Sequence, residues 1–295
     1  MKIGFIGLGI MGKPMSKNLL KAGYELVVCG HVAKSPVEEL IAAGAKAAAT
    51  PKQVAEQTEI IITMLPNSPQ VREVILGENG VVEGIRPGTT LIDMSSIAPG
   101  TSRELADILE AKGCAMLDAP VSGGQPKAID GTLAVMVGGK KEVFEKCLPL
   151  LKAMAASVVL TGDVGAGNVT KLANQVIVAL NIAAMSEALV LATKAGVSPE
   201  VVYQAIRRGL AGSTVLDAKA PLVMDRKFQP GFRINLHIKD LANALETAHE
   251  FGAPLPLTAA VLEMMQALKV AGVGESDHGA LVRYYENMAK VEVRR

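Results

Sequence analysis

The chain has few of the residues from which metal centres and disulfide frameworks are built. Its 295 residues include three cysteines and four histidines, and none of them has C-x-x-C or H-E-x-x-H spacing. The cysteines are odd in number and widely separated, which favours a reducing compartment over an oxidising one. We therefore expect a cytoplasmic protein without a metal site.

Strong charge and membrane-spanning signals are also scarce. The formal net charge is +1, so the composition gives no reason to expect nucleic acid or a membrane surface as a partner. Hydrophobic residues make up 49% of the chain, which is enough for a sizeable core. The longest apolar region, residues 172–192, is interrupted by polar residues such as Asn174, Gln175 and Glu187. It predicts a buried helix in a soluble protein, and the first residues lack the features of a signal peptide.

What the chain does have is a glycine fingerprint near its start. A short β-prone run, Lys2–Ile6, leads into glycines with G-x-G-x-x-G spacing, and a helix is expected over Lys13–Ala22. The first glycine permits a tight turn, the second lets the backbone approach a pyrophosphate, and the third lets the helix pack close to the strand. We predict dinucleotide binding here, in preference to a purely structural turn. The predicted cofactor-binding residues of this loop are Gly7, Gly9, Ile10, Met11 and Gly12.

The pattern of hydrophobic residues divides the chain into two parts. In residues 1–162, short β-rich runs alternate with helix-like stretches, which predicts a mainly parallel, doubly wound sheet of the Rossmann type with helices on both faces. Residues 163–295 have no strand signals and are predicted to form an all-α domain, joined to the first by a long helix over Asn168–Ala195. The expected strands are Glu25–Cys29, Glu59–Leu65, Thr90–Met94, Ala115–Val121, Leu133–Val137 and Val158–Leu160. The further helices expected are Val201–Arg208, Asn235–Phe251, Thr258–Val270 and His278–Val291.

Ligands of such sheets collect beyond the carboxyl ends of the strands. We therefore expect loop residues there to bind the cofactor, namely Met64, Leu65, Pro66 and Ser95. The second strand runs into Cys29-Gly30-His31 without the Asp or Glu that usually binds the ribose of NAD. His31, Lys34 and Ser35 could instead approach a 2′-phosphate, so the choice between NAD(H) and NADP(H) stays open.

Two further segments are candidates for substrate binding. Ser122, Gly123 and Gly124 follow a strand, and their consecutive backbone N–H groups can form a nest for a carboxylate, although a structural turn would use the same residues. On the long helix, Lys171 and the amides Asn174 and Gln175 belong to one polar stripe on an otherwise apolar helix. Either a ligand cleft between the domains satisfies this stripe, or the lysine snorkels and the amides bond to neighbouring loops.

Three blocks in order make the sequence similar to the β-hydroxyacid dehydrogenase family over its whole length. They are the fingerprint continuing through Lys13-Pro14-Met15, the block Asp118–Gly124, and Gly162-x-x-Gly165-x-Gly167-x-x-x-Lys171. A fourth block, His237–Leu241, resembles the family's helix that closes over the nicotinamide.

The resemblance implies an NAD(P)-dependent oxidoreductase that reduces a small carboxylated semialdehyde as a homodimer or homotetramer. It implies that Lys171 is the general acid/base, that the Ser122–Gly124 loop holds the substrate carboxylate, and that Lys239 lies beside the cofactor. Many relatives have asparagine four residues after the lysine, whereas this chain has Gln175 there and Asn174 one residue earlier, so either amide could orient the substrate oxygen. A dinucleotide-binding protein that has lost catalysis is the alternative from another functional class.

Overall fold

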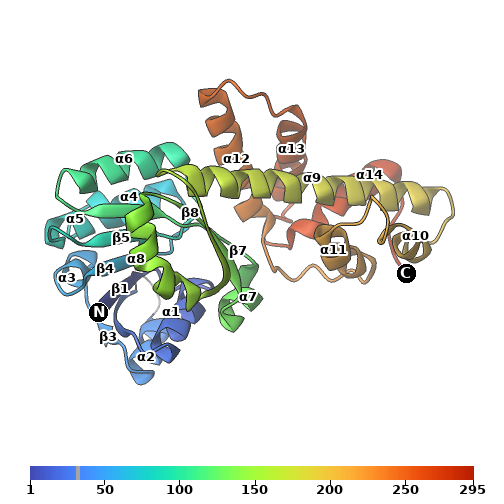
Figure 1. The fold of residues 1–295 in the computed structure, drawn as a ribbon. Coiled ribbons are helices and arrows are strands. Elements are labelled where there is room, and N and C mark those ends of the chain that lie inside the picture. Colours follow the sequence, from blue (N-terminus) through green and yellow to red (C-terminus); the bar gives the residue numbers. More distant parts are fainter. Residues whose placement is uncertain (31–33) are drawn as a thin grey trace. The chain divides into compact units, whose positions relative to one another are not determined.

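A computed structural model describes residues 1–30 and 34–295 of the chain. Contacts divide it into two compact units, Met1–Lys171 and Leu172–Arg295, which are described separately below (Figure 1). This division falls inside helix α9 (Ala166–Lys194), because the first turn of that helix is bonded to the first unit. The domain boundary expected after residue 162 stays a prediction.

The first unit contains a nine-stranded sheet in the described part of the chain. Its strands run in the order β3-β2-β1-β4-β5-β6-β8-β7, and β9 pairs with β8. The six strands from β3 to β6 are parallel, whereas β8 is antiparallel to β6 and β7. The strands are β1 Lys2–Ile6, β2 Glu25–Cys29, β3 Lys46–Ala47, β4 Ile60–Thr63, β5 Thr90–Asp93, β6 Ala115–Asp118, β7 Val121–Ser122, β8 Leu133–Gly138 and β9 Ala155–Gly162. The expected α/β fold with a mainly parallel sheet is confirmed.

The segment expected to be one strand over Ala115–Val121 is two strands. β6 ends at Asp118 and β7 begins at Val121. Between them lies Pro120, which has no N–H to donate to a neighbouring strand. After this break the chain pairs with β8 through β7, which ends at Ser122.

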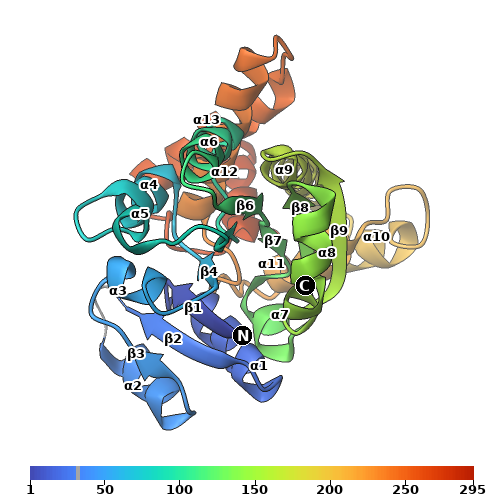
Figure 2. The same ribbon diagram turned by 60° about the vertical axis from the view of Figure 1, so that its left-hand side comes forward.

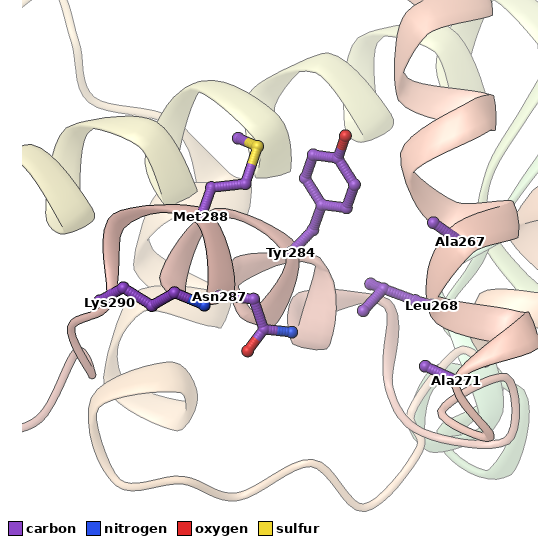
Figure 3. Close-up of a pocket in the computed structure, with 7 residues that line it drawn as sticks. All are labelled: Ala267, Leu268, Ala271, Tyr284, Asn287, Met288 and Lys290. Atoms are coloured by element: carbon purple, nitrogen blue, oxygen red, sulfur yellow. The ribbon is translucent and has the colours of Figure 1, made fainter.

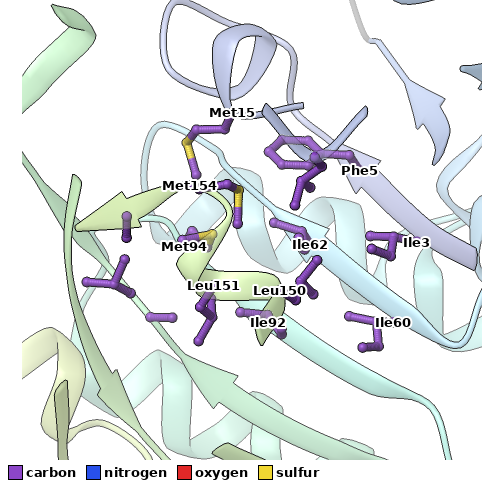
Figure 4. Packing of buried hydrophobic residues seen from close by; sticks show 14 of the residues in the cluster. Ile3, Phe5, Met15, Ile60, Ile62, Ile92, Met94, Leu150, Leu151 and Met154 are labelled. Carbon is purple, nitrogen blue, oxygen red and sulfur yellow. The ribbon is translucent and has the colours of Figure 1, made fainter. Parts of the chain in front are cut away.

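Helices cover both faces of this sheet, as expected from the alternation of strands and helices. Ile60 and Ile62 of β4 pack in the cluster that contains residues of α1 and α8, shown in Figure 4, whereas Ile61 packs in the cluster that contains residues of α3, α4 and α6. This division follows from the alternation of side chains along a strand. Figure 2 shows β1, β2 and β3 side by side in the same sheet. The helices of the first unit are α1 Gly12–Lys21, α2 Lys34–Ala42, α3 Pro51–Ala55, α4 Ser68–Leu76, α5 Val81–Gly84, α6 Pro99–Glu110, α7 Gly124–Asp130 and α8 Lys141–Lys152.

The second unit is helical, as predicted. One helix, α11, was not expected; it contains Pro221, a residue that usually ends or kinks a helix. Its N-cap is Ser213, whose hydroxyl accepts a hydrogen bond from the backbone N–H of Leu216 at 2.9 Å. Besides most of α9, the unit consists of α10 Pro199–Ile206, α11 Thr214–Met224, α12 Ile234–Glu250, α13 Pro256–Val270, the short 3₁₀ helix η1 His278–Leu281 and α14 Val282–Ala289.

Helix α9 is long and apolar enough to cross a membrane by length and composition, a criterion that core helices of soluble proteins also meet. Ala179, Ile182 and Leu189 on this helix are buried in the hydrophobic core of the second unit. The helix is therefore a core helix of the second unit, as its interrupted apolar pattern predicted.

Candidate active site

The glycine loop after β1 has the close contacts that its spacing requires. Gly7 has a φ of +102°, and a Cβ atom there would lie 2.2 Å from the carbonyl oxygen of Met64. A Cβ atom on Gly12 would lie 1.9 Å from the carbonyl oxygen of Gly7. Side chains are thus excluded at both positions, and the turn between β1 and α1 depends on glycine.

The middle of the same loop is open. No atom lies within 4 Å of the Cβ position of Gly9, and Ile10 is 53% exposed. Met11 at the N-cap of α1 makes no side-chain capping hydrogen bond. An open glycine in front of an uncapped helix N-terminus fits the diphosphate of a dinucleotide, which approaches the backbone there and accepts hydrogen bonds from its N–H groups.

The loop after β4 lies against the glycine loop. The backbone N–H of Met64 donates to the carbonyl oxygen of Ile6 at 2.9 Å, and Gly7 packs on Met64 as described above. The chain runs outward from β1 to β3 and returns at β4, so these neighbouring loops stand where the strand order reverses. In parallel sheets this switch point forms the ligand crevice. Leu65, which is half-buried, and Pro66, which is exposed, continue the β4 loop.

Ser95, expected to touch the cofactor, is fully buried and supports the β4 loop. Its hydroxyl donates to Asp93 Oδ1 at 2.6 Å and accepts from the backbone N–H of Leu65 at 2.9 Å. The same carboxylate oxygen accepts a hydrogen bond from the hydroxyl of Thr63 at 2.7 Å. These bonds join the ends of β4 and β5, and a direct contact of Ser95 with the cofactor stays a prediction.

The residues expected to distinguish NAD(H) from NADP(H) are only partly visible. His31 lies outside the described residues, as does the side chain of Lys34, and Ser35 is exposed on α2. Glu39 on α2 accepts hydrogen bonds from Lys13 and Lys17 on α1, at 3.0 and 2.9 Å. The preference between the two cofactors is not decided by these contacts.

The segment that follows β6 has the positive-φ glycines expected of an anion nest. Gly123 has a φ of +133° and Gly124 one of +67°. A Cβ atom on Gly123 would lie 2.7 Å from the side chain of Lys127, so a larger residue is excluded. Ser122 is half-buried and Gly123 is exposed. Binding of a small carboxylate by the backbone N–H groups of this loop stays a prediction.

Asp118, the last residue of β6, holds the start of α9. Its Oδ1 accepts a hydrogen bond from the backbone N–H of Gly165 and its Oδ2 one from that of Asn168, both at 2.7 Å. The side chain is fully buried. Burial raises the pKa of Asp118 to about 6, although the two N–H groups act in the opposite direction, and the nearby Asp93 raises it further.

Asn168 fastens the same helical turn by its side chain. Its Oδ1 accepts from the backbone N–H of Ile97 at 3.1 Å, and its Nδ2 donates to the hydroxyl of Ser102 at 3.1 Å. Lys171 follows on the next turn of α9 and is 6% exposed. The predicted acid/base residue therefore stands on a helix start that is bonded to the ends of β5 and β6 and to α6. Sequence reasoning singled out neither Asp118 nor Asn168 for this role.

In the second unit, the predicted residues Asn174, Gln175 and Lys239 are joined through Asp240. Nδ2 of Asn174 donates to Oε1 of Gln175 at 2.9 Å, and Nε2 of Gln175 donates to Oδ2 of Asp240 at 2.6 Å. The ammonium of Lys239 lies 2.9 Å from the other oxygen of Asp240. Gln175 and Asp240 are buried, whereas Asn174 is half-buried.

Two buried histidines, His237 and His278, pack beside this network, and His237 contacts the backbone of Gln175. Nε2 of His237 lies 3.2 Å from the carbonyl oxygen of Gln175, and Nδ1 of His237 lies 3.0 Å from Nδ1 of His278. A carbonyl only accepts, so Nε2–H of His237 is the donor to Gln175. In a neutral His237 ring, Nδ1 then accepts a hydrogen bond from Nδ1–H of His278. The ring of Phe232 meets both imidazoles edge to face. The histidines have a structural explanation that their sequence spacing did not indicate.

A separate hollow in the second unit lies between α13 and α14 (Figure 3). None of the predicted site residues lines it. The lining residues are Ala267, Leu268, Ala271, Tyr284, Asn287, Met288 and Lys290. This hollow is mostly apolar and is not part of the candidate active site.

Two family models match the two parts of the chain. The model described as the NAD binding domain of 6-phosphogluconate dehydrogenase matches residues 2–162. The model described as NAD-binding of NADP-dependent 3-hydroxyisobutyrate dehydrogenase matches residues 165–285. Both descriptions name NAD binding, which agrees with the dinucleotide binding predicted from the glycine fingerprint.

Individual proteins match over nearly the full length. The 2-hydroxy-3-oxopropionate reductase of Escherichia coli (strain K12) is 46% identical over 98% of each chain. The 2-(hydroxymethyl)glutarate dehydrogenase of Eubacterium barkeri is 39% identical over 99% of this chain and 97% of its own. A solved structure of Mycobacterium tuberculosis 3-hydroxyisobutyrate dehydrogenase with L-serine is 31% identical, with a TM-score of 0.90 over 96% of this chain and 98% of that one. The chain therefore belongs to the β-hydroxyacid dehydrogenase family and is an NAD(P)-dependent oxidoreductase.

Proposed function

We propose that this enzyme is a tartronate semialdehyde reductase (2-hydroxy-3-oxopropionate reductase), which reduces its substrate to D-glycerate with NADH or NADPH. The observation that carries the proposal is the buried Lys171 on a helix start bonded to Asp118, the residue that leads into the Ser122–Gly124 loop. The 46% identity to the Escherichia coli reductase supports this choice of substrate. Such an activity belongs to the breakdown of glyoxylate or sugar acids.

The chain's own residues have three tasks in this reaction. The Ser122–Gly124 amides hold the substrate carboxylate, which fixes the carbonyl carbon in place. When bound, the reduced nicotinamide supplies the hydride. The Lys171 ammonium stabilises the charge that develops on the carbonyl oxygen and donates its proton there. In the reverse direction the neutral amine removes that proton from the hydroxyl. Lys239 contributes a positive charge on the cofactor side.

Of the two candidate amides, Asn174 is the one that orients the substrate oxygen. Both ends of the Gln175 side chain are bonded within the protein, whereas Asn174 is less buried and uses its amide nitrogen for Gln175. We expect Asn174→Ala to lower kcat/KM about 10-fold, because one hydrogen bond contributes about 1 kcal/mol. Asn181→Ala is the matched control, because Asn181 lies further along α9 and its side chain bonds to the carbonyl of Ile177. Equal rates for the two variants would contradict this assignment.

The 3-hydroxyisobutyrate dehydrogenase reaction is the second candidate, since the Mycobacterium tuberculosis structure shares the fold at a TM-score of 0.90. The test is a spectrophotometric comparison of tartronate semialdehyde and methylmalonate semialdehyde, each with NADH and with NADPH. We expect the higher kcat/KM with tartronate semialdehyde. A preference for the methyl-bearing substrate would favour the second candidate. No cofactor oxidation with any small semialdehyde would favour a dinucleotide-binding protein without catalysis.

We further propose a cytoplasmic homodimer or homotetramer. The three cysteines are all free thiols, which suits a reducing compartment. Apolar side chains on α9 are exposed in the single chain, with Ile177 at 61% and Leu191 at 71%, and an interface between subunits would cover them. Sedimentation at several protein concentrations tests this proposal, and a monomer throughout would contradict it.

A further inference from the structure

One buried carboxylate joins the two segments that the proposed reaction needs. Asp118 ends β6, and the chain continues from it into the loop that contains Ser122 and Gly123. Its two oxygens accept the backbone N–H groups of Gly165 and Asn168, at 2.7 Å each, at the start of α9. Gly165 and Asn168 follow Asp118 by 47 and 50 positions in the sequence. Asp118 therefore precedes the Ser122–Gly124 loop in the chain, and its side chain caps the start of α9.

The surroundings of this carboxylate leave it no freedom to move. A Cβ atom on Gly138 of β8 would lie 2.3 Å from Asp118 Oδ1, and one on Gly167 of α9 would lie 2.4 Å from the Asp118 carbonyl oxygen. Only glycine fits at both places, so the backbones of β8 and α9 pack directly on this residue. The Asn168 side chain closes the turn from the other side through Ile97 and Ser102. The position of the first turn of α9 is thus set by Asp118 and Asn168 together.

We propose that Asp118 is a positioning residue, which sets the placement of Lys171 relative to the Ser122–Gly124 loop by capping α9 from the strand that begins that loop. This inference rests on the proposed role of Lys171. An error of about 1 Å in the placement of a reacting group can cost about 100-fold in rate. An asparagine at position 118 would offer one acceptor and would direct its NH₂ group at the second backbone N–H. It would therefore release one of the two attachments.

The charge of Asp118 gives this role a pH signature. Its pKa is raised to about 6, chiefly by burial, so the capping carboxylate becomes protonated on mild acidification. Asp93 from β5 faces it and raises its pKa further, while Arg103 from α6 lies against Gly165. Asp163 precedes the helix, and Lys171 lies on its second turn. A protonated carboxyl cannot accept hydrogen bonds on both oxygens as the carboxylate does, so kcat should decline on the acid side near this pKa.

The experiment compares two variants at the helix start with a matched buried carboxylate elsewhere. Asp118→Asn and Asn168→Ala each release one anchor of α9. Glu286→Gln is the control, because Glu286 is also buried and also accepts a backbone N–H, that of Val293 at 2.8 Å. For each enzyme we would measure kcat and KM across pH 5 to 9, the Kd of NADH, the melting temperature and hydrogen exchange of the segment 163–171.

The expected results separate positioning from stability. Asp118→Asn and Asn168→Ala should each lower kcat about 100-fold, leave the Kd of NADH unchanged and speed exchange at 163–171 about 10-fold. The acid limb near pH 6 should vanish in Asp118→Asn and remain in Asn168→Ala, where the carboxylate is still present. Glu286→Gln should lower the melting temperature without changing kcat.

The outcomes that overturn the inference are distinct from those that overturn the proposed function. Unchanged kcat and exchange in Asp118→Asn would refute a positioning role. If that variant is insoluble, unchanged values in Asn168→Ala would refute it instead, since this residue secures the same turn. Full turnover in a Lys171→Ala enzyme would refute the proposed function, while the exchange data would still report whether Asp118 holds the helix.

Discussion

The two units bury their carboxylates in different ways. In the first unit, Asp118 is surrounded by backbone N–H groups, and burial raises its pKa to about 6. In the second unit, Asp277 is also buried, but the ammonium of Lys219 lies 2.8 and 2.9 Å from its two oxygens. Burial alone would raise the pKa of Asp277, yet the charges of His278 and Lys219 hold it below its usual value.

This difference shows how neutral N–H donors and a cation each affect the pKa of a buried carboxyl. N–H dipoles fix the direction of a buried carboxylate but only partly offset its loss of hydration, whereas a full charge offsets more of it. In the first unit, ionisation of the buried Asp118 carboxyl at the start of α9 is therefore unfavourable. The second unit uses its buried acid to hold its helices together. Substitutions in the two units should therefore affect different properties.

The largest contrast is expected between two lysines. Lys171→Ala should lower kcat about 1,000-fold, because general acid catalysis typically contributes 100- to 10,000-fold. Its melting temperature and its Kd for NADH should stay close to those of the wild type. Steady-state kinetics and cofactor fluorescence titrations measure these quantities. A turnover near that of the wild type would exclude Lys171 as the acid.

Lys219→Met should show the opposite pattern. Removing this ammonium leaves Asp277 buried without its cation, and breaking such a pair costs about 3 kcal/mol of unfolding free energy. We expect a lower urea midpoint with kcat changed less than about 2-fold, since Lys219 is not among the proposed site residues. The double variant Lys219→Met/Asp277→Asn is the control: it removes the unpaired charge but keeps an acceptor for the backbone N–H groups that bond to Asp277, so it should regain part of the lost stability. A stable single variant would show that the pair contributes little.

The pH dependence of stability should separate the two carboxylates further. A raised folded-state pKa means that Asp118 disfavours folding once it is ionised, and this cost grows as pH rises from about 4 to 6. Asp277, whose pKa is lowered, contributes stability above its unfolded-state pKa and loses it only as pH falls further. Between pH 5 and 7.5 the Asp118 contribution should change by about 1 to 2 kcal/mol.

Urea unfolding of the wild type and Asp118→Asn at both pH values measures this change. The difference in unfolding free energy between the two proteins should shift in favour of the variant at the higher pH. A difference that is the same at pH 5 and 7.5 would contradict a raised pKa for Asp118.

The smallest effect is expected at Glu39. Hydrogen bonds from Lys17 and Lys13 lower the pKa of this carboxyl, but the group lies in solvent, where such pairs are screened. Glu39→Gln should leave the urea midpoint unchanged within error at 0.15 M salt and slightly lower it without added salt. A clear loss at high salt would mean that the link between α1 and α2 has a role beyond a surface ion pair.

The sequence predicted those features that depend on neighbours along the chain. The G-x-G-x-x-G spacing places Gly7 and Gly12 where the structure admits no side chain, and alternation of strands and helices predicted the parallel sheet. The same local reasoning was wrong at Pro120, where the single strand expected over Ala115–Val121 is two strands. It also missed helix α11, which contains Pro221 in its interior.

The support of the candidate site could not be predicted in this way. Asp118 and Asn168 are 50 residues apart, and Gln175 and Asp240 are 65 apart. Neither pair has a periodic signal, because these contacts arise only when the sheet and the helices have formed. The family resemblance drew attention to Lys171, but the groups that hold its helix become visible only in three dimensions.

Chemical rescue tests the central claim, that the ammonium of Lys171 delivers the proton. The Lys171→Ala enzyme would be assayed with tartronate semialdehyde, NADH and a series of small primary amines. We predict that the amines restore turnover in proportion to their protonated fraction and that the same amines leave the wild type unaffected. A variant that binds NADH normally, yet gains no activity from any amine, would contradict the claim.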